Sequence, residues 1–478
     1  MNKTIIQFEY KYWLLHPVTG LLFTVWIAVL FFTVHDVSNF LNERRKHTEE
    51  LVKEQNERFV KHIPLMDSFA TGKRTATVFW DDARNAYDIG YVYGRRYLIK
   101  KVLPLAPLSI GQSNLHHGIN TINTSPDSWF MALKKAQKLS NPHNSIFGDF
   151  DVASAITLLL PLLIIAFNFS ILSSEKEDGR LSILLAQGIS VKTFLRSKIV
   201  FRYLVTTLLS WSTVVVAFFL LGFNFFSDMR GCIAFTSVLF LYSALWHLAC
   251  MLVNLFRKSS DFNAGILFTA WIAWVLVIPA ISTAVVSVVK PIPGKVKLID
   301  EMRETLTDYD KKNSQILDQF YTDHPQFVIK DSSKMMPQFM YKYMIKYMNT
   351  LHTLTPLMND YKGRAVEQSK AATYVSILSP AMLFQDVADE VSGHSQIQFL
   401  LFQQYADSVN LQCNNYFNPL SLANRYLTVE EFKKLPTPVY NISINDRKLA
   451  GLIMGLLAWL LLLAFLVTRR IKSYKFIQ

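Results

Sequence analysis

Six apolar segments constrain this chain more than any other feature of its sequence. Crossing the hydrocarbon core of a bilayer takes about 20 residues of helix, and Asp, Glu, Lys and Arg are absent from all six segments. The segments are residues 18–34, 152–172, 203–226, 231–256, 262–289 and 449–468. We therefore predict a mainly α-helical, polytopic membrane protein with six transmembrane helices.

Charge and cysteine content agree with this class. Charged residues make up 18% of the 478 residues, below the value of about 25% that is usual for soluble chains. The net charge is +13, but no dense Lys/Arg block indicates nucleic-acid binding, so the charge reflects basic loops. Cys232, Cys250 and Cys413 show neither pairing nor metal-ligand spacing, and we expect no disulfide framework and no metal site.

Loop charges orient the predicted helices, because Lys and Arg gather on the cytoplasmic side of a membrane. With the N-terminus inside, the loop 173–202 holds six of them and the tail 469–478 holds four. Residues 44–46 favour the opposite orientation, but they belong to a mixed-charge segment that we expect to extend outward as a solvated helix. We predict that both termini are cytoplasmic. The first segment lacks a small-x-small cleavage site, which favours a retained anchor over a signal peptide.

This topology leaves two long extracytoplasmic insertions that together hold more than half of the chain. We expect them to form one large outer domain, the second insertion being mostly helical. The predicted order is an N-terminal segment 1–17, transmembrane helix 1 at 18–35, extracytoplasmic segment A at 36–151, transmembrane helices 2–5 at 152–289 with the cytoplasmic loop 173–202, extracytoplasmic segment B at 290–448, transmembrane helix 6 at 449–468 and a cytoplasmic tail 469–478.

Motifs for enzyme chemistry are absent from the sequence. A phosphate-binding loop needs a Gly-rich turn that ends in Gly-Lys-Ser/Thr, and the nearest match, at residues 72–75, has Asp67 in place of the first Gly. HExxH, GxSxG and CxxC motifs are also missing. We predict that the chain is not an enzyme, has no catalytic or metal residues and binds no cofactor itself.

Two notable polar residues, Asn168 and His247, lie within the predicted spans, which contain no Asp, Glu, Lys or Arg. Ion-coupled transport normally requires ionisable groups at this depth, since such groups are costly in a membrane. Hydrogen bonding between helices explains both residues; a place along a translocation path is the alternative.

The loop 173–202 combines an acidic start, a glycine and a basic amphipathic stretch. At helical spacing, Lys192 and Arg196 point away from the apolar side, whereas Lys198 falls near it and would have to snorkel. The apolar side carries Val191, Phe194, Leu195 and Ile199. This pattern predicts a helix that lies along the cytoplasmic membrane surface and meets a soluble partner. An ordinary basic loop is the alternative.

The same loop resembles the corresponding element of type-2 ABC exporter permeases, which has an acidic start, a Gly, Leu-rich residues, a turn and a later Lys. Arg180 and Gly188 stand where that family usually has Thr and Pro. The resemblance implies an ATPase-coupling element that includes Glu175, Glu177, Gly179, Leu184, Leu185, Lys192, Arg196 and Lys198.

Ser379-Pro380-Ala381, followed by two helical stretches that flank Ser392-Gly393, resembles a subfamily of these permeases with a large extracytoplasmic insert. Its members include gliding-associated and copper-enzyme-maturation permeases. Proline suits the first turn of a helix, where its missing N–H has no partner in any case. The N-terminal stretch QFEYKYWLLHP resembles the amphipathic N-terminal helix of the family.

What the resemblance implies is a permease subunit in the bacterial cytoplasmic (inner) membrane. Two such chains, identical or homologous, would pair, and separate ATP-binding subunits would dock on their cytoplasmic face. ATP would be bound by those subunits, and the coupling element would pass their motion to the spans. A periplasmic or outer-surface protein could dock on the outer domain.

Three function classes stay open at this stage. The first is an exporter that moves a solute across the membrane. The second is a mechanotransmitting ABC permease, whose outer domain acts on an external partner without transport. The third is a membrane receptor or scaffold without an ATPase. Copurification of an ATP-binding subunit separates the third class from the others.

Overall fold

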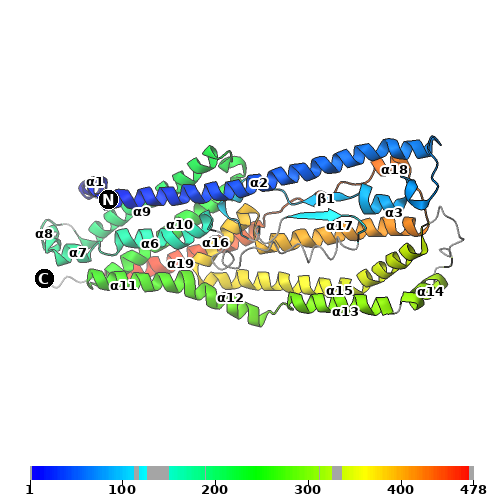
Figure 1. Cartoon of the computed structure of the whole chain (residues 1–478). Coiled ribbons are helices and arrows are strands. Elements are labelled where there is room, and N and C mark those ends of the chain that lie inside the picture. The colour runs from blue at the N-terminus through cyan, green and yellow to red at the C-terminus, as the bar shows by residue number, and fades with distance from the viewer. Residues whose placement is uncertain are drawn as a thin grey trace.

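The computed structural model describes residues 3–111, 113, 118–125, 150–188, 190–311, 313–323, 325 and 336–472. Part of the predicted segment A, residues 126–149, and the tail beyond Lys472 lie outside the described residues. The molecule is elongated and mainly helical: a bundle of helices occupies one half, and long helices project from it to form the other half (Figure 1).

The helices have the following bounds: α1 Lys3–Leu15, α2 Pro17–Ala70, α3 Ala86–Asp88, α6 Val152–Asn168, α7 Ser173–Glu177, α8 Arg180–Ala186, α9 Val191–Leu220, α10 Met229–Asn254, α11 Ser260–Trp271, α12 Ile278–Val289, α13 Lys295–Lys311, α14 Asn313–Asp323, α15 Gln338–Val375, α16 Pro380–Ser392, α17 Gln396–Leu422, α18 Val429–Lys433 and α19 Asp446–Lys472. A π-helical turn, Ile272–Val277, joins α11 to α12. The strands β1, Arg96–Ile99, and β2, Ile119–Ile122, pair in antiparallel register.

Six helical segments of the described chain are long and apolar enough to cross a membrane, which confirms the predicted number of spans and the mainly helical class. They are Pro17–Ala70, Val152–Glu177, Val191–Leu220, Met229–Asn254, Ser260–Val289 and Asp446–Lys472. The first of them is one 54-residue helix, about 80 Å long at 1.5 Å per residue. The mixed-charge segment that follows the first apolar run is therefore part of the same helix.

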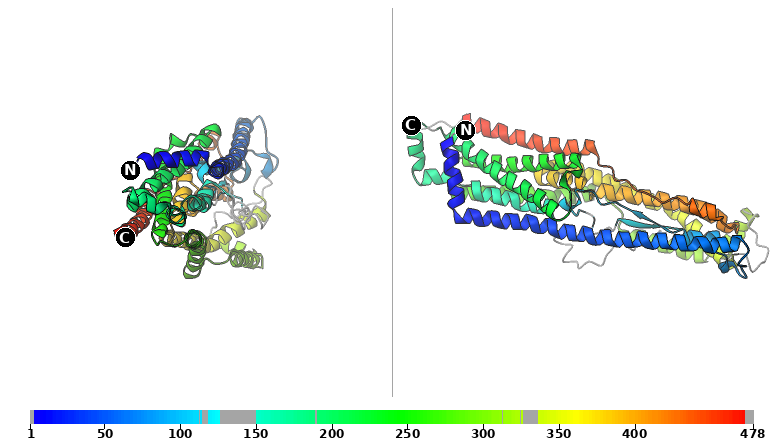
Figure 2. Two further views of the ribbon diagram at one scale, coloured as in Figure 1. Left: turned by 90° about the vertical axis from the view of Figure 1, so that its left-hand side faces the viewer. Right: turned by 90° about the horizontal axis from the view of Figure 1, so that it is seen from above.

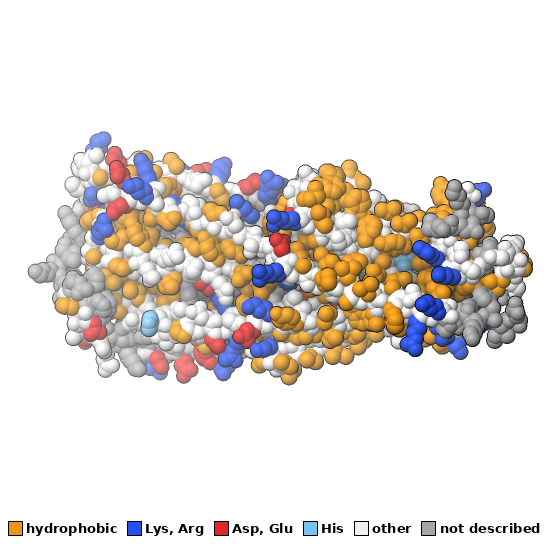
Figure 3. All heavy atoms as spheres, turned by 180° about the vertical axis from the view of Figure 1, so that it is seen from behind, with side chains coloured by type: hydrophobic (Ala, Val, Ile, Leu, Met, Phe, Trp, Pro, Cys, Tyr) orange, Lys and Arg blue, Asp and Glu red, His pale blue; other side chains and the backbone are white. Residues whose placement is uncertain are grey.

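The surface of the bundle carries a broad apolar zone between two bands of Lys and Arg (Figure 3). Such a zone is expected where lipid tails replace water, because apolar side chains then need no cover. At one edge Arg230 pairs with Asp446 at 3.4 Å, and at the other Arg469 and Arg470 end α19. The structure is that of a multi-pass membrane protein.

The N-terminal helix α1 is separate from α2 and lies across the end of the bundle (Figure 2). His16 breaks the helix with extended backbone angles, and Pro17 opens α2 at its first turn, where proline fits without loss of a hydrogen bond. We call the end of the bundle that holds α1, α7, α8 and the last turn of α19 the terminal end (Figures 1 and 2).

Helix α16 corrects the sequence analysis, which placed Ser379-Pro380-Ala381 and the following helix in the outer domain. The structure packs α16 between α6, α10 and α19, within the bundle core. The Phe384 ring is fully buried and lies 5.2 Å from the Tyr242 ring and 6.1 Å from the Phe235 ring of α10. Helix α16 was missed as part of the bundle because it is short and carries acidic residues on its other side.

The N-cap of α16 fastens it to the fifth span. In the π-helical turn the Ile278 N–H donates to the Ala273 carbonyl, one residue before its α-helical partner, Trp274. The next amide that could reach Trp274 belongs to Pro279, which has no N–H. The Ser379 hydroxyl donates to this carbonyl at 2.5 Å and also caps the amides of Ala381 and Met382.

The projecting part of the molecule consists of the outer half of α2, the strands, and helices α13 to α15, α17 and α18 (Figure 1). We call it the projecting domain. The amide side chain of Gln55 on α2 accepts from the Tyr97 amide of β1 at 2.7 Å, and Lys362 of α15 pairs with Asp407 of α17. Three long helices thus run together from the bundle to the tip.

We predict that Ser379→Ala lowers the free energy of unfolding by about 2–4 kcal/mol, because it removes a helix cap and leaves the buried Trp274 carbonyl unpaired. The matched control is Thr428→Ala, which removes the exposed N-cap of α18 alone and should cost about 1 kcal/mol. Unfolding in detergent would be followed by circular dichroism. Equal decreases in the free energy of unfolding of the two variants would show that Ser379 acts only as a helix cap.

Candidate functional site

The predicted coupling loop forms a protrusion at the terminal end. Helix α7 follows α6 after a turn, and Gly179, with φ of +70°, reverses the chain into α8. Left-handed backbone is strained for residues with a Cβ, which explains the glycine. The Ser190 hydroxyl then accepts from the Thr193 amide and caps α9. Helices α7 and α8 reach beyond the ends of the neighbouring spans (Figure 1).

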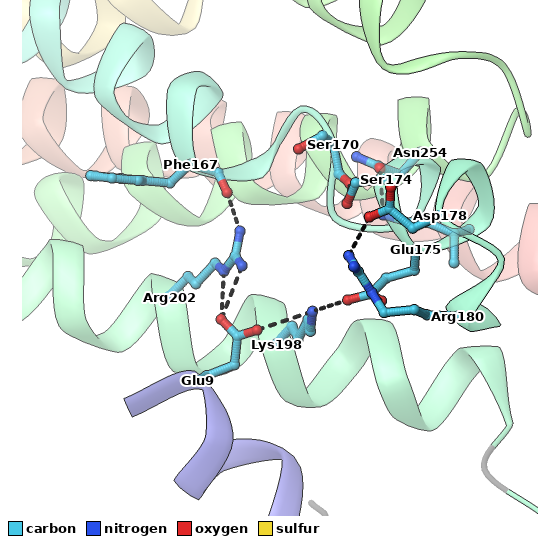
Figure 4. Close-up of polar contacts among 11 residues, drawn as sticks. Glu9, Phe167, Ser170, Ser174, Glu175, Asp178, Arg180, Lys198, Arg202 and Asn254 are labelled. Carbon is cyan, nitrogen blue, oxygen red and sulfur yellow. Dashed lines mark hydrogen bonds and ion pairs between the residues drawn. The ribbon is translucent and has the colours of Figure 1, made fainter. Parts of the chain in front are cut away.

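Six alternating charges run across the base of this protrusion (Figure 4). Glu9 of α1 receives Arg202 at 2.9 Å and Lys198 at 3.1 Å, both from α9. Lys198 also pairs with Glu175 of α7 at 3.0 Å. We call this series the charge chain; in order, it consists of Arg202, Glu9, Lys198, Glu175, Arg180 and Asp178.

The two halves of the charge chain differ in burial. Side chains of Glu9 and Lys198 are 1% and 7% exposed, whereas Arg180 and Asp178 are 56% and 49% exposed. Exposed ion pairs contribute about 1 kcal/mol or less. Removal of one member of a buried pair costs about 3–5 kcal/mol, because the other charge stays buried and unpaired. The Glu9 end therefore determines whether α1, α7 and α9 stay together.

Arg202 has a further role within the bundle. Its guanidinium donates to Glu9 through Nε and Nη2, at 3.0 and 2.9 Å, and through Nη1 to the Phe167 carbonyl near the end of α6. One cation thus joins α1, α6 and α9.

Glu177 connects the protrusion to the fifth span. Its carboxylate accepts from the Ser260 amide and the Ser260 hydroxyl, both at 2.8 Å, in the first turn of α11. A carboxylate is favourable there because the first amides of a helix lack partners and carry partial positive charge. Lys176 donates to the Arg257 carbonyl in the turn between α10 and α11 at 3.3 Å.

Buried amide side chains connect the base of α7 to the neighbouring helices. Asn254, near the end of α10, accepts from the Leu172 amide at 3.0 Å and donates to the Asn168 carbonyl at 2.9 Å. Asn263 of α11 donates to the Phe169 carbonyl at 3.2 Å. The turn between α6 and α7 is therefore fixed to both α10 and α11.

The apolar side that the amphipathic pattern predicts is buried in the structure. Val191, Phe194, Leu195 and Ile199 are all buried, in a cluster with Ile5 of α1 and Leu255. Leu184 and Leu185 of α8 pack against this cluster from its edge. The stretch is not a separate surface helix, however: it forms the first turns of α9 and continues into the third span.

The predicted snorkelling of Lys198 is wrong. Its side chain is buried between Glu9 and Glu175, and the ammonium lies 4.5 Å from the centre of the Phe194 ring. A cation with two carboxylate partners can stay within a low-dielectric site at a much lower cost.

Four of the predicted coupling residues lie on the outer surface of the protrusion or beside it. The exposed residues are Glu177, Gly179, Lys192 and Arg196. Ile183 of α8 is 60% exposed and adds an apolar side chain to this charged surface. The hydrogen bond from Arg180 to Glu175 raises the pKa of the guanidinium, so its charge is permanent at this surface.

The polar residues predicted within the spans are engaged in the core. The Asn168 amide donates to the Ile164 carbonyl of its own helix at 2.6 Å. His247 contacts the Ser243 carbonyl at 2.8 Å and the Thr206 hydroxyl of α9 at 3.4 Å. The contact between His247 and Thr206 joins two helices, as expected, whereas the Asn168 side chain bonds within its own helix.

Sequence reasoning missed Glu9 and Arg202 as members of the site. The available signal was the position of Glu9 four residues after Ile5, on the buried side of α1. Its partner Arg202 lies 193 residues away in the chain, and spacing alone cannot identify such a pair. Among the described residues, no group of His, Cys, Asp or Glu could hold a metal ion.

Comparison with known proteins adds one match. The family described as a domain of unknown function (DUF3526) matches residues 295–441, which extend from the first residue of α13 to just beyond α18. The match covers the second half of the projecting domain together with α16, and none of the six spans. Neither the curated proteins nor the solved structures gave a match.

We predict that Glu9→Gln lowers the free energy of unfolding by about 3–5 kcal/mol, because Lys198 and Arg202 lose the carboxylate that they share. Glu49→Gln on α2 is the matched control: Glu49 pairs with Arg45 at 3.0 Å, but both side chains are exposed. It should cost less than about 1 kcal/mol. Denaturant unfolding in detergent measures both; a Glu9→Gln loss as small as that of the control would contradict the assigned role.

Proposed function

We propose that this chain is the permease subunit of an ABC transporter in a bacterial cytoplasmic membrane and that it exports a solute when a separate subunit hydrolyses ATP. The ATP-binding subunit docks on the α7–α8 protrusion. The chain itself supplies the membrane path and no catalytic residue or cofactor site. The observation that carries this proposal is the structure of the protrusion. Its tip is exposed, and buried polar contacts join its base to the spans.

The base contacts explain how a docked ATPase would move the spans. Glu175 pairs with Lys198 of α9, and Glu177 accepts hydrogen bonds from the first turn of α11. Asn254 of α10 bonds to the base of α7. A displacement of α8 therefore reaches several helices through rigid, partly buried contacts. This is the arrangement that energy coupling between a soluble motor and a membrane bundle needs.

Charge supports a cytoplasmic position for the terminal end. Arg469, Arg470 and Lys472 end α19, and Lys192 and Arg196 begin α9 at the same end. Cytoplasmic loops carry such an excess of Lys and Arg. In this orientation both described chain ends are cytoplasmic and the projecting domain is extracytoplasmic.

A second permease copy, identical or homologous, would complete the transporter. The fifth span supports this, because it buries few of its residues: in α11 and α12 these are Asn263, Leu267, Ser282 and Val286. Its remaining apolar surface is available to lipid or to a second chain.

One structural feature favours the alternative, a mechanotransmitting permease that acts on an external partner without transport. Helix α2 continues from the first span to the tip of the projecting domain without a break. A stiff helix of this kind carries motion across the membrane to a periplasmic or outer-surface protein. ATP-driven movement of a solute into sealed vesicles favours export, whereas ATP turnover without solute movement favours this alternative.

The docking site is tested with the tagged chain, purified gently from native membranes and examined by mass spectrometry for an ATP-binding subunit. We predict that Ile183→Asp combined with Arg196→Glu reduces recovery of the ATP-binding subunit at least tenfold, because the changes place negative charge on the proposed docking surface. Both residues are exposed, so the buried contacts of the protrusion stay intact. Val60→Asp is the control: Val60 is 64% exposed, but it lies on the projecting part of α2. If no ATP-binding subunit accompanies the native chain, the chain is a receptor or scaffold instead.

The orientation has its own test. Single cysteines would be placed at Ser182 of α8 and at Thr71 beyond α2, both exposed, in a chain whose own cysteines are serine. We predict that a membrane-impermeant maleimide labels Ser182→Cys only in inside-out vesicles and Thr71→Cys only in right-side-out ones. The reverse pattern would place the protrusion outside and exclude a cytoplasmic ATPase.

A further inference from the structure

Three arginines with too few acidic partners lie in the projecting domain, where α2 passes β1. Arg58 comes from α2, Arg95 precedes β1 and Arg96 opens it. Glu54 pairs with Arg58 at 3.0 Å and with Arg95 at 3.3 Å. No ion pair forms on Arg96 within the described part of the chain. Three positive charges and one negative charge leave a local charge of +2.

Arg96 is the least expected of the three. It is 6% exposed, and its Nε and Nη1 atoms are buried without a hydrogen-bond partner among the described residues. Its guanidinium lies over the Phe59 ring, 4.1 Å from the centre, and Phe59 stacks on Phe432. Burial, and then the charge of Arg58, lowers the pKa of Arg96 to about 10, so it still carries its charge at neutral pH.

The surrounding contacts hold the three guanidiniums in place. Arg58 donates through Nη2 to the Arg95 carbonyl at 3.1 Å, and Arg95 lies 5.6 Å from the centre of the Tyr97 ring. The Nε atoms of Arg58 and Arg95 are also buried without a partner in the described structure. Four buried donor atoms on these three cations therefore lack an acceptor among the described residues.

We propose that Arg58, Arg95 and Arg96 bind an oxyanion, the phosphate or carboxylate group of a small solute. The paired N–H donors of a guanidinium group match the oxygen positions of both phosphate and carboxylate. Water could accept the same hydrogen bonds, but it would leave two positive charges uncompensated in a site where an unpaired charge costs several kcal/mol. An oxyanion supplies the acceptors and the negative charge together.

The position of the site excludes a headgroup of the surrounding bilayer as the ligand. Arg58 lies 24 residues beyond the first apolar segment (58 − 34) on the continuous helix α2, or about 35 Å at 1.5 Å per residue. The anion must therefore reach the site from the solution around the projecting domain. The site does not depend on whether the chain docks an ATPase.

Isothermal titration of the purified full chain in nanodiscs tests the site, with inorganic phosphate and succinate as separate probes in chloride buffer of constant ionic strength. We expect saturable binding of at least one probe. Arg96→Met should weaken it at least tenfold, because methionine keeps an apolar side chain against Phe59 but removes the buried charge. Arg45→Met is the control: Arg45 is exposed, lies on the same helix as Arg58 and pairs only with Glu49 among the described residues, so binding should not change.

The two probes distinguish the sources of the oxyanion: binding of phosphate alone indicates a phosphate-bearing solute, and binding of succinate alone indicates a carboxylate. If Arg96→Met does not fold, Arg95→Gln, at a partly exposed position, provides the same comparison. The proposal is overturned if neither probe binds the native chain saturably. It is also overturned if the arginine variants bind as tightly as the native chain.

Discussion

The buried carboxylate of Glu9 is the interaction on which the terminal end of this molecule depends. It lies between two buried cations of α9: without it Arg202 would lose its carboxylate partner among the described residues, and Lys198 would keep only Glu175. Because Lys198 passes the interaction on to Glu175, an N-terminal helix that could simply float on a membrane is instead tied to the protrusion. The position of α7 and α8 is therefore set by residues that are far apart in the chain.

A second constraint acts in the middle of the bundle. A proline in the fifth span leaves the Trp274 carbonyl without an amide, and the hydroxyl of Ser379 takes its place. This contact explains why Ser-Pro-Ala stands where it does: serine supplies the cap and the donor, and proline fits the first turn. It also connects the spans to the projecting domain, since α16 lies in the bundle core and is joined along the chain to α15 and α17. Motion of the spans would therefore be transmitted to the projecting domain. Such transmission is compatible with export of a solute and with action on an external partner.

The sequence predicted the spans well, because long runs without charge can satisfy their backbone in lipid only as helices. It also predicted which side of the segment that begins at Val191 is buried, since 3.6-residue periodicity is a local property. The sequence did not predict contacts between residues that are far apart in the chain. The charge of Lys198 predicted snorkelling because neither Glu9 nor Glu175 is visible as a partner from spacing. Helix α16 was placed outside the bundle because its acidic residues hide an apolar face made by Leu383, Phe384 and Val387.

In the proposed coupling mechanism, motion of α8 reaches the spans through the charge chain. The most direct measurement is the distance between spin labels at Ser182 of α8 and Leu220, an exposed residue at the end of α9, in the complex with the proposed ATP-binding subunit, with and without a non-hydrolysable ATP analogue. We predict that the analogue shifts this distance in the native chain and that the shift is lost in a folded Glu9→Gln variant. An equal shift in both chains, or none in the native chain, would contradict it.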